Sequence, residues 1–225
     1  MLLAEELLLL VTDDTSGRLS APAPQVDVGL GGANLIELTL MNKVDISGGD
    51  DPGRRGRIVI RDRSPSGDQV LDAALQTLIA REGKKPAAVL QPLGKNLRPV
   101  LYQRLTDSGV LRAAQRRALG IFPTRTWPTQ DAGPEAEVRQ AVTQALVQRT
   151  SPDQRTAAIV ALLYALKCEH KVIDPRSYQM SRRQLRARAA EIAEGNWASD
   201  AVRRAIAEMA AAVAASAATT AATSG

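Results

Sequence analysis

Apolar residues recur at helical spacing along most of this 225-residue chain. The pattern is clearest in residues 3–11, where leucine dominates, in residues 70–79, and in residues 157–166, which are apolar without interruption. A helix that is apolar on every side must be buried on every side, so residues 157–166 are the predicted central helix of the fold. Further helices are expected at residues 26–41, 96–108, 135–149, 181–194 and 199–213.

Two short segments are expected to form a β-hairpin. Residues 57–61 are a β-branched run between arginines, and residues 44–46 are the expected partner strand. The arginines at 54, 55, 57, 61 and 63 leave two interpretations open, a second electrostatic patch or a charged edge strand protected from aggregation. Together the elements predict one compact, mainly α-helical domain over residues 1–214, with short hairpins and a disordered small-residue tail at residues 215–225.

Composition restricts the classes of function. Aromatic residues make up only 3% of the chain, so the core must be built from Leu, Ala, Val and Ile, which favours packed helices. The single cysteine, Cys168, excludes a disulfide within the chain, and the single histidine, His170, leaves no partner for a Cys/His metal site. The two stand two apart on a helix and point to different faces, so no catalytic pair is expected. The sequence predicts neither an enzyme nor a cofactor.

The apolar N-terminus does not fit a secretory signal, because Glu5 and Glu6 stand where a basic region is required. No stretch reaches the ~20 apolar residues of a membrane-spanning helix. We therefore expect a cytoplasmic protein whose membrane contact is peripheral, on the cytoplasmic face. Arginine outnumbers lysine 23 to 6, a bias that is typical of a GC-rich genome and favours a bacterial source.

Positive charge is concentrated in one segment. Residues 95–127 hold seven basic side chains and one acid, a balance of +6, whereas the whole chain carries +5. The basic residues are Lys95, Arg98, Arg104, Arg112, Arg116, Arg117 and Arg125. The segment ends with Phe122, the only phenylalanine, and Trp127, one of two tryptophans. A positive field beside a short aromatic loop is what binding to an anionic membrane surface requires.

Two parts of this segment supply candidate lipid-binding residues. Lys95 and Arg98 are three apart near a predicted helix start, so they share a face and could hold a phosphate group with the free backbone amides. Phe122 and Trp127, on a loop restricted by prolines, are expected to insert into the membrane interface, while Arg125 pairs with lipid phosphates. The plainer alternatives are a solvated helix face and two aromatic rings tucked into the core. Apolar insertion and charge together, but neither alone, give stable attachment.

The alternative function is a basic nucleic-acid-binding or protein-interaction module without lipid binding, because the isoelectric point is near 9.7. The sequence contains no recognisable zinc finger, RNA-recognition strand motif or convincing helix-turn-helix, so nucleic acid is not expected as a partner. Assembly into a homo-oligomer is left open.

With these segments in hand, the chain resembles the Golgi phosphoprotein 3 family of peripheral membrane proteins, found in eukaryotes and in many actinobacteria. The likeness runs from Leu3 to about Met209. It is carried by Glu5–Leu10 with the Asp/Gly turn that follows, Leu35–Leu40, Ser66–Leu75, Gly109–Leu111 and Arg155–Tyr164, in this order and spacing.

The resemblance implies a single, mostly helical domain with a protruding hydrophobic β-hairpin at about residues 120–127. It also implies recognition of phosphatidylinositol 4-phosphate by a basic pocket beside that hairpin, lined in eukaryotic members by one tryptophan and three arginines. Two of the arginine positions fall on Lys95 and Arg98, which keeps positive charge. The tryptophan position falls on Pro22 and the first arginine position on Gly31, which favours generic anionic-lipid binding over phosphoinositide specificity.

Overall fold

A computed structural model describes the chain, apart from residues 14–15, 49–54, 119–121, 196–206, 208 and 216–225. Its helices are α1 (Leu3–Val11), α2 (Ala23–Leu40), α3 (Gln69–Ile79), α4 (Ala87–Gly94), α5 (Leu97–Asp107), α6 (Gly133–Leu146), α7 (Gln154–Ala165), α8 (Glu169–Val172), the 3-10 turn η1 (Pro175–Tyr178) and α9 (Arg182–Glu194). Its strands are β1 (Val44–Ile46), β2 (Ile58–Ile60), β3 (Ala114–Ala118) and β4 (Phe122–Thr126). The predicted mainly α-helical fold with short β-hairpins is confirmed.

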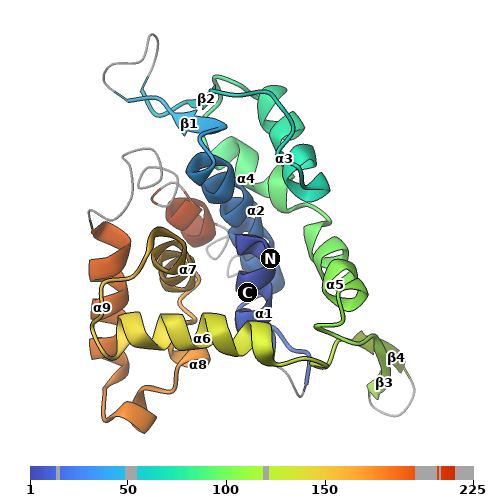
Figure 1. Cartoon of the computed structure of the whole chain (residues 1–225), viewed down its shortest axis with the longest axis vertical. Coiled ribbons are helices and arrows are strands. Elements are labelled where there is room, and N and C mark those ends of the chain that lie inside the picture. The colour runs from blue at the N-terminus through green and yellow to red at the C-terminus, as the bar shows by residue number, and fades with distance from the viewer. Residues whose placement is uncertain (14–15, 49–54, 119–121, 196–206, 208, 216–225) are drawn as a thin grey trace, which may run out of the picture.

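Helices α1 and α2 run through the middle of the molecule, with α6 to α9 on one side and α3 to α5 on the other (Figure 1). Every residue of α1 is buried, and α2 is buried without a break over residues 28–39. The helix α7, predicted as the central helix, is buried over residues 157–163 and packs against both α1 and α2. The centre of the fold is therefore shared by three helices, each of which needs apolar neighbours on several sides.

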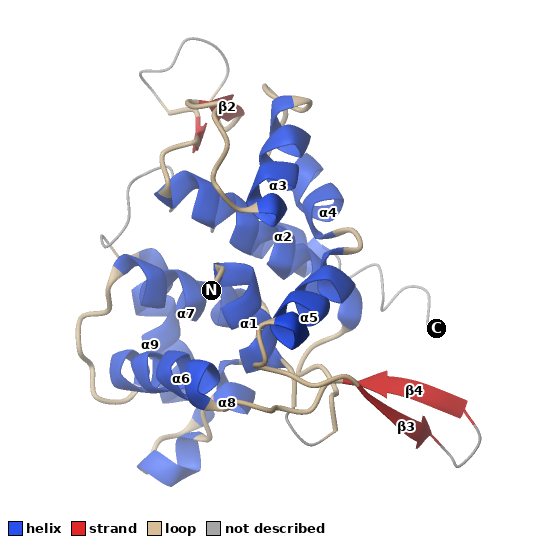
Figure 2. Cartoon of the chain, turned by 45° about the vertical axis from the view of Figure 1, so that its right-hand side comes forward, coloured by secondary structure: helices blue, strands red, loops and turns tan. Residues whose placement is uncertain are grey.

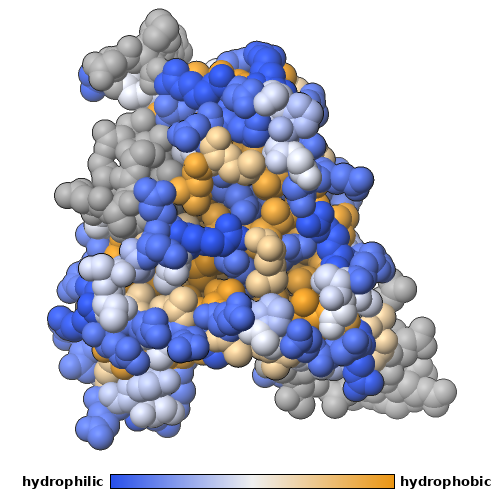
Figure 3. Space-filling view, in the orientation of Figure 1, coloured by the Kyte–Doolittle hydropathy of each residue, from blue (hydrophilic) through white to orange (hydrophobic). Residues whose placement is uncertain are grey.

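The surface follows from this arrangement. In the view of Figure 3, hydrophilic side chains cover most of the upper part of the molecule, and apolar side chains show between hydrophilic ones in its middle. Among the described residues, the large apolar side chains with the most exposure are Met1, Met41, Val100 and Tyr178.

Two acidic residues inside α1 are buried against arginines from different helices. Glu5 accepts a hydrogen bond from Arg104 Nε at 2.8 Å, and Glu6 accepts one from Arg155 Nε at 2.9 Å. Arg155 also donates to Glu37 of α2 at 3.0 Å, so one guanidinium joins α7 to both central helices. Burial raises the pKa of Glu6, and the charge of Arg155 opposes that rise. These pairs allow a helix with two acids to lie in the core, since a buried unpaired carboxylate is strongly destabilising.

The close approach of α2 and α4 depends on two glycines. A Cβ atom on Gly31 would collide with the carbonyl oxygen of Leu90, and one on Gly94 would collide with the carbonyl oxygen of Asp27. The two helix backbones can touch here because neither glycine has a side chain. The sequence pattern did not predict α4, which is only eight residues long and contains Pro92.

Strands β1 and β2 form the antiparallel pair that the sequence predicts. Two of the arginines around this hairpin pair with acids. Arg61 pairs with Asp45 at 2.7 Å, and Arg63 pairs with Glu82 at 2.6 Å. Arg54 lies outside the described residues. At Arg61 and Arg63 the paired charges favour the protected edge strand over a second electrostatic patch.

The predictions for the C-terminal region fall partly outside the described residues. The helix expected at residues 199–213 is described at residue 207 and from 209 to 215, where Met209 and Val213 are buried in the core. The tail expected to be disordered lies outside the described residues, except for Ala215. Within the described part of the chain, none of the helices combines the length and the apolar character that crossing a membrane requires.

Candidate functional site

The hairpin of β3 and β4 stands out from the helical body in two views (Figures 1 and 2). Its strands are antiparallel, with Ala114 opposite Thr126, and the pairing continues toward the helices through a hydrogen bond from Arg112 N to Pro128 O at 3.0 Å. The sequence predicted a hairpin at residues 120–127, but its first strand begins earlier, at Ala114. The sequence of β3 is too polar to show the apolar alternation of a half-buried strand, so its bounds have no signal in the pattern.

The base of the hairpin is held to α5 by two stacked aromatic rings. The ring centroids of Trp127 and Tyr102 are 4.1 Å apart and the ring planes differ by 4°. The hydroxyl of Tyr102 is 2.9 Å from the hydroxyl of Thr12, and burial raises the pKa of Tyr102. Trp127 is partly buried against the core. Of the two interpretations of Trp127, this position favours the ring packed on the protein body over a ring at the tip of the loop.

Phe122 and Arg125 lie on β4 itself. The backbone of Phe122 is opposite Ala118, and that of Arg125 is opposite Gln115. Both residues therefore belong to the projecting part of the chain, as the sequence predicted, although the structure does not describe their side chains. Residues 119–121, which connect the two strands, lie outside the described residues.

Lys95 and Arg98 lie where α4, α5 and α2 meet. Lys95 follows the last residue of α4, its side chain is exposed, and within the described residues it has no hydrogen-bond or ion-pair partner. Arg98 is engaged: its Nε donates to Asp27 Oδ1 at 2.5 Å and its Nη2 to Asp27 Oδ2 at 3.3 Å. The backbone of Gly94, the residue before Lys95, lies against that of Asp27, so the contact of α2 with α4 places this acid at the junction. The junction carries one net positive charge.

Arg104, another basic residue of the segment 95–127, is engaged with acids of the fold. Its guanidinium donates to Glu5 at 2.8 Å and to Asp68 at 2.7 Å, so it is a structural link between α5, α1 and the start of α3. The two departures from the family pocket also have a structural reason. Pro22 precedes the first residue of α2 and is exposed, whereas Gly31 is buried in the contact with α4 and has no room for a side chain.

One helix connects the basic junction to the hairpin. Arg98 and Tyr102 are four apart on α5, hence on one face, and Tyr102 holds Trp127 at the hairpin base. The eleven residues of α5 make a helix about 16 Å long, so the junction and the projecting strands are separate contact points on one surface. Lys95 and Arg98 lie just before and within the first turn of α5, whereas Phe122 and Arg125 lie on β4, so the two groups are joined through α5 and the hairpin base.

Sequence reasoning missed Asp27 and Tyr102. Asp27 is 71 residues before Arg98, and no local pattern indicates that the two side chains meet. Tyr102 had a weak signal, since it is a large aromatic residue four positions after Arg98 in a predicted helix.

The thiol and imidazole near the end of α7 do not form a reactive pair. Cys168 is fully buried, and burial raises the pKa of its thiol to about 12. A neutral thiol is a poor nucleophile and a poor metal ligand. Within the described residues, no group of three or more His, Cys, Asp or Glu side chains is arranged to hold a metal ion.

The chain is similar to known proteins. A family model described as Golgi phosphoprotein 3 (GPP34) matches residues 3–209. Vacuolar protein sorting-associated protein 74 of Eremothecium gossypii is 27% identical over 176 residues, which are 68% of this chain and 51% of that protein. The chain thus spans about half the length of the curated relative that it matches.

Proposed function

Because the chain belongs to the Golgi phosphoprotein 3 family, we propose that it is a peripheral membrane protein, not an enzyme, that binds anionic phospholipid headgroups on the cytoplasmic face of a membrane. The observation that carries this proposal is the projecting hairpin. Between Asp107 and Asp131 the sequence has four arginines and no acid, and this is the stretch that forms the hairpin and its base.

The hairpin has physical features of a surface-binding element. A two-stranded sheet that stands apart from helices is only marginally stable in water, so it gains from a partner surface. Its base is fixed by the stack of Trp127 on Tyr102, which reduces the freedom that must be lost on binding. The backbone pairing keeps Phe122 and Arg125 three residues apart on one strand, an apolar and a cationic group for the two zones of a membrane interface.

The binding free energy expected from these groups is sufficient for reversible attachment to a membrane. Four arginines near an anionic surface contribute ~1 kcal/mol each. Half-burying one phenylalanine removes about 100 Å² from water and contributes about 2.5 kcal/mol at ~25 cal/mol per Å². The sum, roughly 6.5 kcal/mol, corresponds to a dissociation constant on the order of tens of micromolar. Trp127 adds to this only through the part of its ring that the stack leaves exposed.

Lys95 and Arg98 are proposed as the headgroup contacts, with phosphatidylinositol 4-phosphate as the type of ligand that the family implies. Lys95 is exposed and without a described partner, so it is ready for a phosphate group. The Arg98 guanidinium must give up its ion pair with Asp27 before it can bind the phosphate group. A more highly charged phosphomonoester competes with that carboxylate better than a phosphodiester does.

Co-sedimentation with vesicles tests the proposal. Wild-type protein is expected to bind phosphatidylcholine vesicles that contain phosphatidylglycerol and not those of phosphatidylcholine alone. The substitution Phe122→Ala is expected to weaken binding at least tenfold, and the double variant R116E/R117E to abolish it. The matched control is K84E/K85E, which makes the same charge change at two exposed lysines between α3 and α4. If both double variants lose the same affinity, the hairpin is not the binding element.

Two further experiments test the headgroup contacts and the alternative function. With vesicles of equal total charge, K95E/R98E is expected to weaken binding to phosphatidylinositol 4-phosphate more than binding to phosphatidylglycerol, and an equal loss refutes a headgroup role for these residues. Duplex DNA at the same ionic strength tests the alternative of a nucleic-acid-binding module, for which binding to DNA would exceed binding to anionic vesicles.

A further inference from the structure

A small cavity lies between α8, the turn η1 and the first residues of α9, away from the hairpin. In Figures 1 and 2 this turn and the hairpin lie at opposite lower corners of the molecule. The cavity has a volume of about 310 Å³. This is at the lower end of the range for ligand sites, so it suits a small molecule or a single headgroup.

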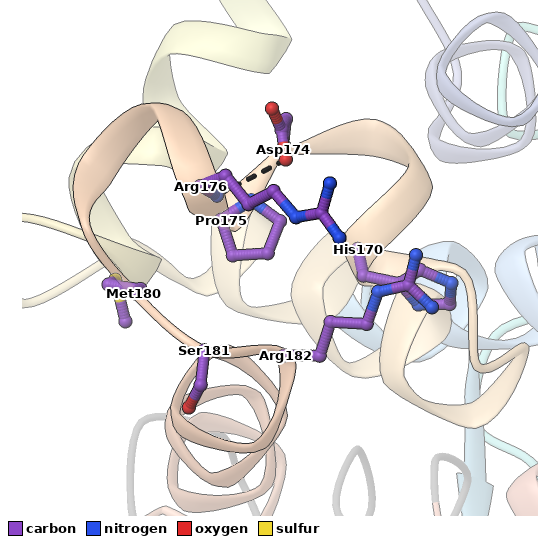
Figure 4. Close-up of a pocket in the computed structure, with 7 residues that line it drawn as sticks. All are labelled: His170, Asp174, Pro175, Arg176, Met180, Ser181 and Arg182. Carbon is purple, nitrogen blue, oxygen red and sulfur yellow. Dashed lines mark hydrogen bonds between the residues drawn. The ribbon is translucent and has the colours of Figure 1, made fainter.

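Two arginines and the single histidine are among the residues around this cavity. His170, Arg176 and Arg182 line it, and Figure 4 shows the two guanidinium groups extending toward the imidazole. Asp174 is the acid in the lining, and its carboxylate is used locally, accepting hydrogen bonds from Arg176 N at 3.2 Å and from Ser177 Oγ at 3.1 Å. The charge of the cavity is therefore positive.

Two arginines of the lining are free to bind a ligand. Within the described residues, the exposed guanidiniums of Arg176 on η1 and Arg182 at the start of α9 have no hydrogen-bond or ion-pair partner. Further along α9, Arg186 pairs with Glu169 at 2.9 Å and lies over the ring of Tyr164, while Arg188 pairs with Glu191. Arg176 and Arg182 are therefore available to an anion in the cavity.

Two features of the cavity favour an anion. Arg182 is the first residue of α9, where the helix dipole disfavours a cation and favours a negative charge. The pKa of His170 is lowered, first by burial and then by the positive charges of Arg182, Lys171 and Arg186, which Glu169 opposes. A negative ligand would offset these positive charges, because it attracts both guanidiniums and stabilises the protonated imidazole.

We propose that this cavity binds a small phosphate-type anion, held by Arg176 and Arg182 and by an N–H of His170. The phosphate belongs either to a free ion or small phosphomonoester or to a lipid headgroup, and both offer the same oxygens to guanidinium donors. The site is separate from Lys95, Arg98 and the hairpin, so it does not rest on the proposed membrane attachment.

The single histidine makes the test direct. In the full chain, the ring carbon–proton signal of His170 is unambiguous in an NMR spectrum. Addition of inorganic phosphate at constant pH and ionic strength, with sodium chloride as the compensating salt, is expected to shift this signal saturably, with half-saturation at a few millimolar or less. In saturating phosphate, a pH titration is expected to give a higher pKa for His170 than in chloride.

Variants test whether the shift of the His170 signal comes from phosphate bound in the cavity. The double variant R176Q/R182Q is expected to weaken the phosphate response at least tenfold, while the control R183Q, at the next residue of the same helix turn, leaves it unchanged. Both changes are at exposed residues, and a circular dichroism melt checks that the fold is kept. The proposal is overturned if phosphate shifts the signal no more than chloride does, or if R176Q/R182Q and R183Q respond alike.

Vesicles distinguish the source of the phosphate. If R176Q/R182Q binds phosphatidylglycerol vesicles as tightly as the wild type while losing the NMR response, the ligand is a free phosphate compound. If vesicle binding falls in parallel, the ligand is a headgroup. Hairpin variants that fail to bind vesicles are expected to keep the phosphate response, so the failure of one proposal leaves the other intact.

Discussion

The guanidinium of Arg98 on α5 is held by the carboxylate of Asp27 on α2, with Nε 2.5 Å from Oδ1. This pair changes the electrostatics of the proposed lipid-binding junction. The sequence alone counts two cations, Lys95 and Arg98, whereas the structure adds an acid that is paired with Arg98. A phosphate group that binds Arg98 must therefore displace an internal competitor.

Removing that competitor is expected to strengthen membrane binding. Asp27→Asn takes away one negative charge at the junction and frees Arg98, which is worth about 1 kcal/mol, or roughly fivefold in affinity for anionic vesicles. Because the pair is partly exposed, the stability cost is expected to be only about 0.2–1 kcal/mol. Co-sedimentation with phosphatidylglycerol vesicles measures the effect.

The matched control for Asp27→Asn is Glu137→Gln, an equal charge change at an exposed residue of α6. A similar gain in both variants would mean that net charge, not the release of Arg98, controls binding.

The Trp127–Tyr102 stack is expected to stabilise the hairpin base. Trp127→Ala should lower both thermal stability and vesicle affinity, whereas Trp127→Phe keeps a ring to stack and retains most of both. In a double-mutant cycle with Tyr102→Ala, the coupling free energy of unfolding is expected to be about 0.5–1.5 kcal/mol. A coupling near zero would show that the rings do not support one another. Vesicle binding that is unchanged in Trp127→Ala would remove Trp127 from the membrane site.

The contact between α2 and α4 is expected to reject any side chain at Gly31. Gly31→Ala forces a Cβ against the Leu90 carbonyl, which belongs to a helix backbone, so we expect a loss of about 3 kcal/mol in the free energy of unfolding. Gly29→Ala is the matched control on the same helix. Its Cβ would meet only the end of the flexible Leu166 side chain, at 3.2 Å, and Ala favours the helix. Urea denaturation compares the two, and equal stabilities would contradict the packing argument.

Cys168 is expected to couple stability to alkaline pH. Burial raises the pKa of its thiol from 9.0 to about 12 in the folded chain, so between these values the unfolded state releases the proton first. Stability is therefore complete below pH 9 and falls by about 1.4 kcal/mol per pH unit as pH rises toward 12.

Comparison of wild type with Cys168→Ala isolates the contribution of the thiol to the pH dependence of stability. The loss of stability that the smaller side chain causes does not itself depend on pH. The difference in unfolding free energy between the two proteins is expected to shrink above pH 9. A thiol reagent at pH 8 should label the wild type only after denaturation, and rapid labelling of the native chain would contradict the burial of the thiol.

Local pattern predicted much of the helical fold. The apolar composition of residues 3–11 and 157–166 predicts buried helices, and the β-branched side chains of residues 57–61 predict a strand. The pattern does not indicate α4, where a proline interrupts a short helix, or β3, whose sequence has no alternation of apolar and polar residues. Periodicity indicates an element only where apolar residues recur at its spacing over enough positions.

The candidate site also contains residues whose position the sequence could predict and residues whose partners it could not. Phe122 and Arg125 could be assigned to a projecting element because turn residues and prolines act over a few positions. The state of Arg98 and of Arg104 could not be predicted, since their partners Asp27, Glu5 and Asp68 are 71, 99 and 36 residues away.

What the sequence determined by itself is therefore a helical protein with a basic, aromatic segment, because helix formation and charge density are properties of neighbouring residues. What only the tertiary structure decided is which charges are free. Ion pairs and ring stacks form between side chains that are distant in the chain, and packing of α2 against α4 and α5 is what brings Asp27 to Arg98 and leaves Lys95 exposed. Burial and proximity, not residue type, determine whether a cationic side chain is held in an ion pair within the fold or is free to bind a ligand.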